Sequence, residues 1–460
     1  MTITTNTKTI LADRITPVSL YLKIRDQFHH SFLLESADYH GNENAKSIIC
    51  FQPLASFVVH GSSIKTQGLE LNSEKTITQK NEVVNELQKF IRSFNIQSEA
   101  HSFNGIFGYT AYDAINYFET IALDDKKTKS DIPEMQYSFF KYIVEINHFN
   151  NQLTVVENLV DDEPSNIEMI VKLINNHTET QYSFAALHEE TSNITDQEFK
   201  AMITQAKKHC QLGDVFQMVL SRQFSRSFKG DEFNVYRALR SVNPSPYLFY
   251  FDFGGFKLFG SSPESQLKVA NGKATINPIA GTFKRTGNDQ QDNELAKELS
   301  NDPKENAEHN MLVDLARNDL SKHGKNVTVK SYKEVHFYSH VIHLVSEVET
   351  EINQSQSIQI FADTFPAGTL SGAPKYKALK LINQYENQNR GFYGGAIGYF
   401  GFDGSVNHAI TIRSFLSKEN RLYCQAGAGV VIGSDEESEL QEVNNKLSAL
   451  KQALTLAEHI

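Results

Sequence analysis

Tryptophan is absent from this chain of 460 residues, and cysteine is scarce. The three cysteines (Cys50, Cys210 and Cys424) lie far apart and form no CxxC pair. This spacing predicts neither a zinc site nor a disulfide framework, and it is typical of proteins from a reducing compartment.

A surplus of positive charge is also missing, because the net charge is −11 at pH 7. Nucleic acid and anionic membrane surfaces repel a strongly acidic chain, so neither is expected as its main partner. An anionic substrate remains compatible with this charge, because a site can be locally positive or contain a metal ion.

The sequence has no long apolar run. Its Thr-rich start, MTITTNTKTILADR, lacks a hydrophobic core of signal-peptide length. No stretch approaches the roughly 20 apolar residues that a membrane helix needs. We therefore expect a cytoplasmic protein without a membrane segment. The chain is long enough for one large or two ordinary domains.

Strand and helix patterns occur along the whole chain without alternating regularly. Val215–Phe224 alternates as a strand does, and Thr195 and Glu198 form a capping box before a helical period. This arrangement disfavours a Rossmann or barrel fold. It predicts an α+β fold with large, mainly antiparallel β-sheets packed in a sandwich with flanking helices. The polar stretch 161–190 suggests a division into residues 1–185 and 186–460.

One acidic stretch, Pro303–Asp319, reads as a helix whose preceding aspartate is a good N-cap. Glu305 and Glu308 are three residues apart, so both carboxylates project from one side. At about 100° per residue, the same stripe continues through Leu312 and Leu315. A carboxylate pair that leads into an apolar stripe points inward and needs a cation, a proton or many hydrogen bonds.

A second acidic helix is predicted at Ser434–Ala457, with Ser434 as its N-cap. Glu439, Glu442 and Lys446 lie beside its apolar face. If the two helices face each other, their carboxylates converge and need a divalent cation. An oxygen-only ligand set favours Mg²⁺. Two independent solvated faces are the alternative.

Two glycine-rich stretches, Pro278–Thr282 and Gln425–Gly429, each follow a strand-like run. Their exposed N–H groups can bind carboxylates, although simple tight turns give the same pattern. Arg413, in a predicted strand, is either a bidentate carboxylate clamp or a surface arginine. His343 lies in an apolar run and reads as a core histidine, and Glu264 is either a turn cap or a general acid.

Together these segments resemble the chorismate-utilising enzymes, and within them the anthranilate synthase component I group. The resemblance is dense over residues 195–455 and thinner towards LLESA (33–37). It rests on SPE (262–264), PIAGT (278–282), AEHNMLVDLARND (307–319), HVIHLVS (340–346), FPAGTLSGAPK (365–375), YGGAIGY (393–399), IRS (412–414) and QAGAGVV (425–431).

The resemblance implies a lyase that adds ammonia to chorismate at C2, with loss of the C4 hydroxyl and then of pyruvate. The product would be anthranilate, made in the first committed step of tryptophan biosynthesis. It implies Mg²⁺ ligands at Glu308 and Glu442, with Glu305 and Glu439 behind them through water. Glu264 matches the general acid, with His343 close to the same chemistry. The implied substrate-binding residues are Gly281, Thr282, Tyr393, Arg413, Gly427, Ala428, Gly429 and Lys446.

Two positions separate this chain from the alternative activities in the family. Isochorismate synthases carry a lysine where this chain has Gln217, and aminodeoxychorismate synthases carry a lysine where it has Ala280. Both substitutions favour ammonia as the external nucleophile.

The resemblance also implies a partner and an inhibitor. A separate glutamine amidotransferase subunit (anthranilate synthase component II) would supply ammonia, since no such segment is recognisable here. Tryptophan would inhibit the enzyme by feedback at a site formed by Ser36, Pro246, Tyr247 and Leu248.

Overall fold

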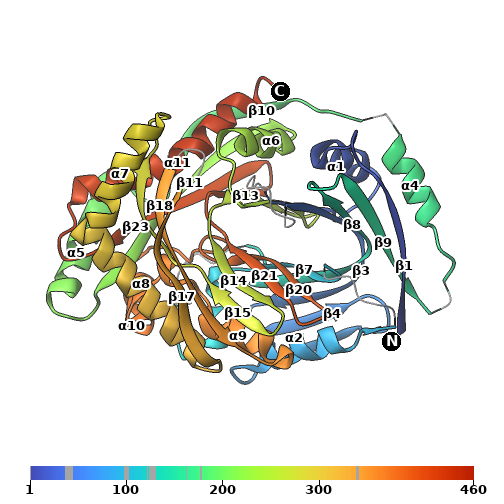
Figure 1. Cartoon of the computed structure of the whole chain (residues 1–460), viewed down its shortest axis with the longest axis horizontal. Helices are drawn as coiled ribbons and strands as arrows, with labels where there is room; N and C mark the ends of the chain where they lie inside the picture. The colour runs from blue at the N-terminus through green and yellow to red at the C-terminus, as the bar shows by residue number, and fades with distance from the viewer. Residues whose placement is uncertain are drawn as a thin grey trace.

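The computed structural model describes residues 2–36, 45–97, 103–121, 123, 131–161, 163–176, 179–337 and 341–460. Two β-sheets share the long strands β3 (Lys46–His60) and β8 (Met135–Asn147), which pair along their length (Figure 1). The β3–β8 register shifts between Pro53 and Ala55. Proline cannot donate to a β-ladder and is tolerated at such a bulge. The two halves of β3 pair with different neighbours, residues 47–50 with residues 32–35 and residues 56–60 with residues 63–67, and so belong to the two sheets of the sandwich.

The first sheet contains the halves of β3 and β8 that pair with β2 and β9. All its pairings are antiparallel except the short contact between β1 and β6. Beyond β3 its strands are β2 (Phe32–Glu35), β12 (Tyr247–Asp252), β13 (Lys257–Ser262), β22 (Ser414–Lys418), β23 (Arg421–Val430), β11 (Gln217–Gly230) and β10 (Phe184–Ser192). Beyond β8 they are β9 (Gln152–Val160), β1 (Thr2–Leu11) and β6 (Asn95–Ile96).

The second sheet contains the other halves of β3 and β8, and it is antiparallel throughout. Beyond β3 its strands are β4 (Ser63–Gln67) and β5 (Ser73–Thr76). Beyond β8 they are β7 (Gly105–Thr110), β20 (Ala396–Gly401), β21 (Val406–Ile410), β14 (Ser265–Ala270), β15 (Lys273–Ile276), β18 (Val341–Glu351), and on β18 also β16 (Ile279–Lys284) and β17 (Lys325–Phe337). The predicted α+β fold with mainly antiparallel sheets is confirmed.

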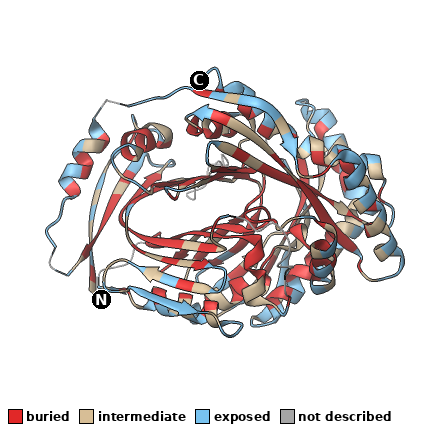
Figure 2. Cartoon of the chain, turned by 180° about the vertical axis from the view of Figure 1, so that it is seen from behind, coloured by how far each residue is buried: buried red, intermediate tan, exposed pale blue. Residues whose placement is uncertain are grey.

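Side chains from both sheets meet in one buried cluster, which is the core of the sandwich. Phe249 and Phe251 come from the first sheet, and Phe107 and Ile397 come from the second. Figure 2 shows that the strands in the middle of the molecule are buried along most of their length while the helices expose their outer faces. The apolar alternation of these strands thus supplies the core between the sheets.

Helices cover the outer faces of both sheets. Two further buried clusters contain their apolar faces, one for each group of helices. The first group contains α1 (Pro17–Arg25), α4 (Ile167–Asn175), α5 (Asp196–Gln211), α6 (Phe233–Val242), α10 (Lys375–Tyr385) and α11 (Glu436–Ala457). The second contains α2 (Glu82–Arg92), α8 (Pro303–Ser321) and α9 (Ser357–Thr364). α7 (Asp289–Asn301) lies beside α8 at one end of the molecule (Figure 1).

The predicted acidic helix is α8, and its start is confirmed. Asp302 Oδ1 accepts hydrogen bonds from the backbone N–H groups of Lys304 and Glu305, at 2.8 and 2.9 Å. Leu312 and Leu315 are buried, and the two glutamates on their stripe are half-buried. The inward direction of the stripe was therefore predicted correctly.

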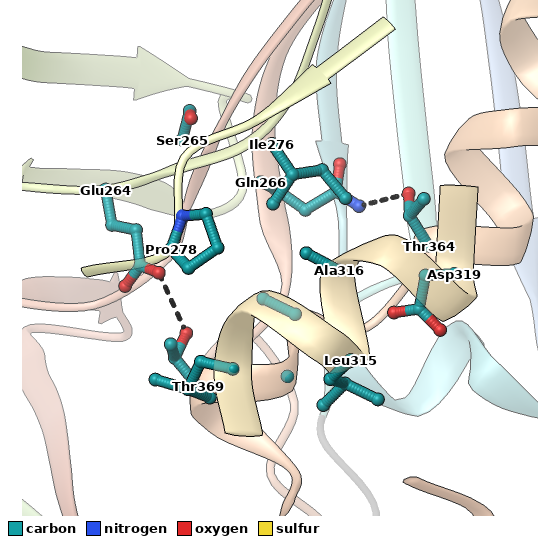
Figure 3. A pocket seen from close by; sticks show the side chains of 13 residues that line it. Glu264, Ser265, Gln266, Ile276, Pro278, Leu315, Ala316, Asp319, Thr364 and Thr369 are labelled. Atoms are coloured by element: carbon teal, nitrogen blue, oxygen red, sulfur yellow. Dashed lines mark hydrogen bonds between the residues drawn. The ribbon is translucent and has the colours of Figure 1, made fainter. Parts of the chain in front are cut away.

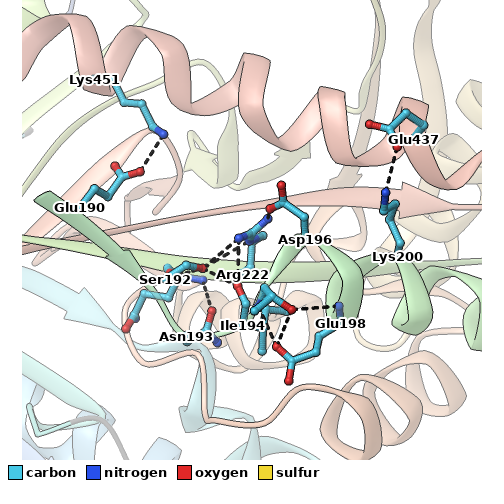
Figure 4. Close-up of polar contacts among 12 residues, drawn as sticks. Glu190, Ser192, Asn193, Ile194, Asp196, Glu198, Lys200, Arg222, Glu437 and Lys451 are labelled. Atoms are coloured by element: carbon cyan, nitrogen blue, oxygen red, sulfur yellow. Dashed lines mark hydrogen bonds and ion pairs between the residues drawn. The ribbon is translucent and has the colours of Figure 1, made fainter.

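The second acidic helix, α11, starts later than predicted. Its N-cap is Asp435, whose carboxylate accepts from the Ser438 N–H at 2.9 Å, so the expected cap at Ser434 is wrong. Ion pairs fasten α11 at both ends: Lys200–Glu437 at 3.0 Å and Lys451–Glu190 at 2.7 Å (Figure 4). Because these pairs are exposed, their contribution to stability is small, and apolar packing places the helix.

Strand pairing joins the two predicted regions of the chain. β2 pairs with β12, and β7 pairs with β20, so both sheets contain strands from each side of residue 185. The boundary between residues 185 and 186 falls inside β10. The division into 1–185 and 186–460 stays a prediction. No helix in the described part of the chain is long and apolar enough to cross a membrane.

Candidate active site

The two acidic helices bring their carboxylates to one place. The pKa of Glu305 is raised by burial, and then by the negative charges of Glu308 on its own helix and of Glu442 on α11. Charges on both helices act on this one carboxyl group, which supports the prediction that the acidic faces of α8 and α11 lie near each other.

Glu308 is held by a side chain of β11. Gln217 donates from Nε2 to Glu308 Oε1 at 2.7 Å. Gly429 of β23 lies against this pair, since a Cβ added there would stand 2.5 Å from Gln217 Nε2 and 3.7 Å from Glu308 Oε1. A larger residue at 429 would push the amide away from the carboxylate.

Glu439 and Glu442 differ in their surroundings. Glu439 is only 5% exposed, and its Oε2 is buried without a hydrogen-bond partner among the described residues. Burial raises the pKa of Glu439, and the charge of Glu442 adds to this effect. Burial also opposes the ionisation of Glu442, but the Lys446 ammonium at 2.5 Å holds its pKa below the ordinary value.

These carboxylates fit one kind of metal site better than another. In the described ranges, no group of three or more His, Cys, Asp or Glu side chains is close enough to hold a metal ion. The described residues therefore do not form a closed protein cage for a metal ion. Mg²⁺ is usually bound by one or two carboxylates that leave room for waters and substrate oxygens. An all-carboxylate set with one unpartnered buried oxygen suits that open arrangement.

Glu264 lies in the turn between β13 and β14 and is 8% exposed. Burial raises its pKa to about 8, although a hydrogen bond from Thr369 and the charges of Lys446 and Arg413 oppose the shift. The Thr369 hydroxyl donates to Glu264 Oε1 at 3.1 Å. At neutral pH Glu264 is thus a protonated carboxylic acid beside two cations, and it can donate a proton.

Arg413 does not lie in a strand, contrary to the sequence prediction. It occupies a left-handed bend, with φ 49°, between β21 and β22, and its carbonyl accepts from the Ser261 N–H at 3.1 Å. Its guanidinium makes no hydrogen bond or ion pair with a described residue, and burial lowers its pKa. A half-buried cation without a protein partner favours a bound carboxylate.

The glycine-rich end of β23 faces Tyr393 and Lys446. Lys446 donates from Nζ to the Gly427 carbonyl at 2.8 Å. A Cβ on Gly427 would stand 3.1 Å from the Tyr393 hydroxyl oxygen, so glycine keeps this approach open. The side chain of Ala428 is completely buried in the core on the opposite face of the strand. Ala428 can therefore contact a ligand only through its backbone.

His343 and Gly281 connect this site to Glu305. The Gly281 carbonyl can only accept, so the hydrogen bond of 2.7 Å to His343 fixes the imidazole proton on Nδ1. Burial lowers the pKa of His343, which keeps the ring neutral. Gly281 has φ 69°, and an added Cβ would stand 3.1 Å from Glu305 Oε2. The side chain of Thr282 is outside the described residues.

The residues expected to bind tryptophan come together on two neighbouring strands. Leu248 of β12 lies opposite Glu35 of β2, so Tyr247 and Ser36 follow next on the two strands. The Ser36 N–H donates to the Lys46 carbonyl at 3.1 Å. Pro246 precedes Tyr247 and, like it, is half-buried.

The sequence interpretation missed two supports of the site. Thr369 lies in a recognised motif, but only the fold reveals that its hydroxyl meets Glu264. Arg390 is buried and donates to Glu386 at 2.6 and 2.8 Å and to the carbonyls of Leu370 and Val219 at 2.7 Å. Its guanidinium also lies 5.8 Å from the Tyr393 ring centre. Glu386 precedes Arg390 by four residues, and this i,i+4 spacing was the sequence signal that could have revealed the contact between them.

Comparisons with known proteins agree with this geometry. The family described as chorismate binding enzyme matches residues 30–452. Anthranilate synthase component 1 of Aquifex aeolicus is 34% identical, covering 98% of this chain and 94% of that protein. The same component of Acetivibrio thermocellus is 35% identical, covering 99% and 96%. The crystal structure of anthranilate synthase component I from Streptococcus pneumoniae superimposes with a TM-score of 0.77 at 31% identity, covering 97% and 100%.

Proposed function

The chain belongs to the family of chorismate binding enzymes, and from this membership we propose that it makes anthranilate and pyruvate from chorismate and ammonia. One observation carries the choice within the family. The two positions that distinguish the alternative activities hold Gln217 and Ala280, so neither supplies an amine. They accompany a buried acid of raised pKa, Glu264, and a cation without a partner among the described residues, Arg413.

The nucleophile must come from outside the chain. Position 217 holds an amide whose Nε2 donates to Glu308, and an amide has no basic lone pair with which to activate water. Position 280 holds the methyl group of a buried alanine. Lys446 is engaged by Glu442 and by the Gly427 carbonyl. Because none of these three residues can supply or activate a nucleophile, free ammonia takes this role.

Each charged group of the site has a role towards a dianionic substrate. Arg413 offers a bidentate contact for one carboxylate, and the backbone N–H groups of Gly427 and Gly429 would add hydrogen bonds to the substrate. Mg²⁺, held by Glu308 and Glu442 with Glu305 and Glu439 behind them, would neutralise the ring carboxylate.

Proton transfers complete the scheme. As the nitrogen–C2 bond forms, the ring double bond shifts and the C4–oxygen bond breaks, and Glu264 protonates the departing hydroxyl. The nitrogen loses one proton in the same half-reaction, so no proton is consumed overall. Neutral His343, protonated on Nδ1, retains a basic Nε2 that suits removal of the C2 proton when pyruvate leaves.

The product made from chorismate, ammonium and Mg²⁺ tests this function. We expect the purified chain to release anthranilate and pyruvate in equal amounts, measured by anthranilate fluorescence and a pyruvate-coupled assay. Aminodeoxychorismate or isochorismate as the only product would overturn the proposal. Omitting Mg²⁺ in the presence of a chelator is expected to abolish turnover.

We also propose a separate glutamine amidotransferase subunit as partner, in the cytoplasm. The three cysteines are unpaired, which suits a reducing compartment. With glutamine in place of ammonium, the chain alone is expected to be inactive, and adding the partner subunit should restore turnover. Glutamine-dependent turnover by the chain alone would contradict this prediction.

We propose that tryptophan binds where β2 ends beside the start of β12, between the region 1–185 and this neighbouring strand. The Ser36 hydroxyl would donate to the charged carboxylate of tryptophan. Loss of such a bond costs roughly 1.5–3 kcal/mol. Ser36→Ala is therefore expected to raise the inhibition constant for tryptophan about 10- to 150-fold.

The kinetic constants for chorismate should stay unchanged in Ser36→Ala. Ser73→Ala, on the exposed strand β5, is the matched control and should leave inhibition as it is. Equal inhibition of the two variants by tryptophan would place the inhibitor elsewhere.

A further inference from the structure

A small cavity lies behind Glu264, on the side of the second sheet. It measures about 30 Å³ and lies between β14, α8 and the segment 364–369 (Figure 3). About 10–15 Å³ of such space is enough for one water molecule, so the cavity accommodates about two. Its polar lining includes Glu264, Gln266, Asp319, Thr364 and Thr369.

The amide of Gln266 has a defined orientation in this cavity. Thr364 donates its hydroxyl proton to the Ile360 carbonyl at 2.9 Å, so the same oxygen must accept from its other neighbour. Gln266 Nε2 supplies that donor at 3.0 Å. The amide oxygen Oε1 is therefore directed elsewhere, and it is buried without a hydrogen-bond partner in the described part of the chain. A buried acceptor of this kind calls for an ordered water.

A buried ion pair closes the far side of the cavity. Lys375 donates from Nζ to Asp319 Oδ2 at 2.5 Å and to the Thr364 carbonyl at 3.0 Å. No described residue donates to the second oxygen of Asp319. Burial raises the pKa of Asp319, against the charges of Lys375 and Lys322, while Glu119 adds to the rise. The groups that face Glu264 itself are the cations Lys446 and Arg413.

We propose that ordered water in this cavity links the carboxyl group of Glu264 to Gln266 Oε1 and Asp319, and that Glu264 regains its proton through this water after each proton donation. The step is balanced. Glu264 loses one proton to the departing hydroxyl, and the attacking ammonia releases one proton to solvent as it becomes an amine. The cavity water passes one proton to the Glu264 carboxylate and takes up one from solvent, so no net proton is gained or lost. Gln266 acts as a positioning residue, because it fixes the water and does not touch the substrate. The proposal rests on the proposed role of Glu264 as the acid.

Two variants disturb the water in different ways. Gln266→Met removes the acceptor at similar length, and Ala316→Val adds two methyl groups to the cavity wall without changing a polar group. In both, we expect kcat to fall about 10- to 100-fold, part of the 10²–10⁴ that acid–base catalysis supplies. The KM for chorismate should change less than about twofold, because substrate contacts remain. The solvent deuterium isotope effect on kcat should increase, because proton return becomes slower.

A crystal structure of the unliganded wild type supplies the independent readout. It is expected to contain water within hydrogen-bond distance of Gln266 Oε1 and Glu264, and the Ala316→Val structure is expected to lack it. A dry wild-type cavity, or unchanged kcat and isotope effect in Ala316→Val, would overturn the proposal. If Gln266→Met fails to fold, Ala316→Val decides alone. Failure of the proposed function is distinct, since the wild type would then release no anthranilate.

Discussion

Glu264→Gln is expected to lower kcat for anthranilate formation by about 10²- to 10⁴-fold, the range that a positioned general acid supplies. Glutamine has the size of a protonated glutamic acid and can still accept the hydrogen bond from Thr369. It cannot release a proton to the C4 hydroxyl. The KM for chorismate should change little, because Glu264 is neutral in the active form and holds no substrate charge.

The raised pKa of Glu264 also predicts how kcat depends on pH. The pKa of Glu264 is raised to about 8, so the proton-donating form is fully present below that pH and is lost as the pH rises through it. In the wild type, kcat should therefore fall tenfold per pH unit on the alkaline side of about 8. The residual activity of Glu264→Gln should lack this limb.

Thr369→Val tests whether the alkaline limb of the kcat profile is due to Glu264. The Thr369 hydroxyl stabilises the ionised carboxylate, so its removal should raise the pKa of Glu264 and move the alkaline limb to higher pH. Glu168→Gln, on an exposed glutamate of α4, is the control and should leave the profile unchanged. If Glu264→Gln retains wild-type kcat, the acid is another group, and His343 is then the next to replace.

Local signals explain which parts of the fold could be predicted from the sequence. The start of α8 depends on Asp302 and Pro303, which act within one turn, and the apolar stripe depends on a fixed helical period. Both were read correctly. The N-cap of α11 was misplaced by one residue, since Ser434 and Asp435 are both good caps and only backbone geometry separates them.

Local sequence patterns failed to predict the backbone conformation at Arg413. Its flanking residues alternate as a strand does, yet the chain turns there through a left-handed conformation that pattern reading does not assign to arginine. The turn takes the guanidinium out of the alternation of β21 and β22. The sequence identified Arg413 as a candidate carboxylate-binding residue, but the alternation of its neighbours placed it wrongly in a strand.

Contacts between residues far apart in the sequence could not be predicted either. Thr369 meets Glu264 across 105 residues, and Gln266 meets Thr364 across 98. Neither pair leaves a periodic trace in the sequence. The resemblance to a family supplied the candidate site residues, whereas the contacts that support them became visible only in the folded structure.

Glu308→Gln is expected to have the second large effect, on Mg²⁺-dependent turnover. The substitution keeps the side-chain shape, and its amide oxygen can still accept from Gln217 Nε2, so the fold should remain. What is lost is the negative charge beside Glu305. Replacing groups that merely orient metal ligands costs about 10- to 100-fold in metal affinity, so loss of a ligand should cost at least about 100-fold.

Metal binding can be measured without turnover. Mg²⁺ that binds only the folded state should raise the melting temperature of the wild type, and this rise should be absent or need far higher Mg²⁺ in Glu308→Gln. Asp314→Asn is the matched control, since it removes an exposed carboxylate from the same helix. A variant that keeps both activity and the Mg²⁺-dependent shift would show that Glu308 is not a ligand. Because Glu305 is raised in pKa by Glu308, the variant should also ionise Glu305 at lower pH.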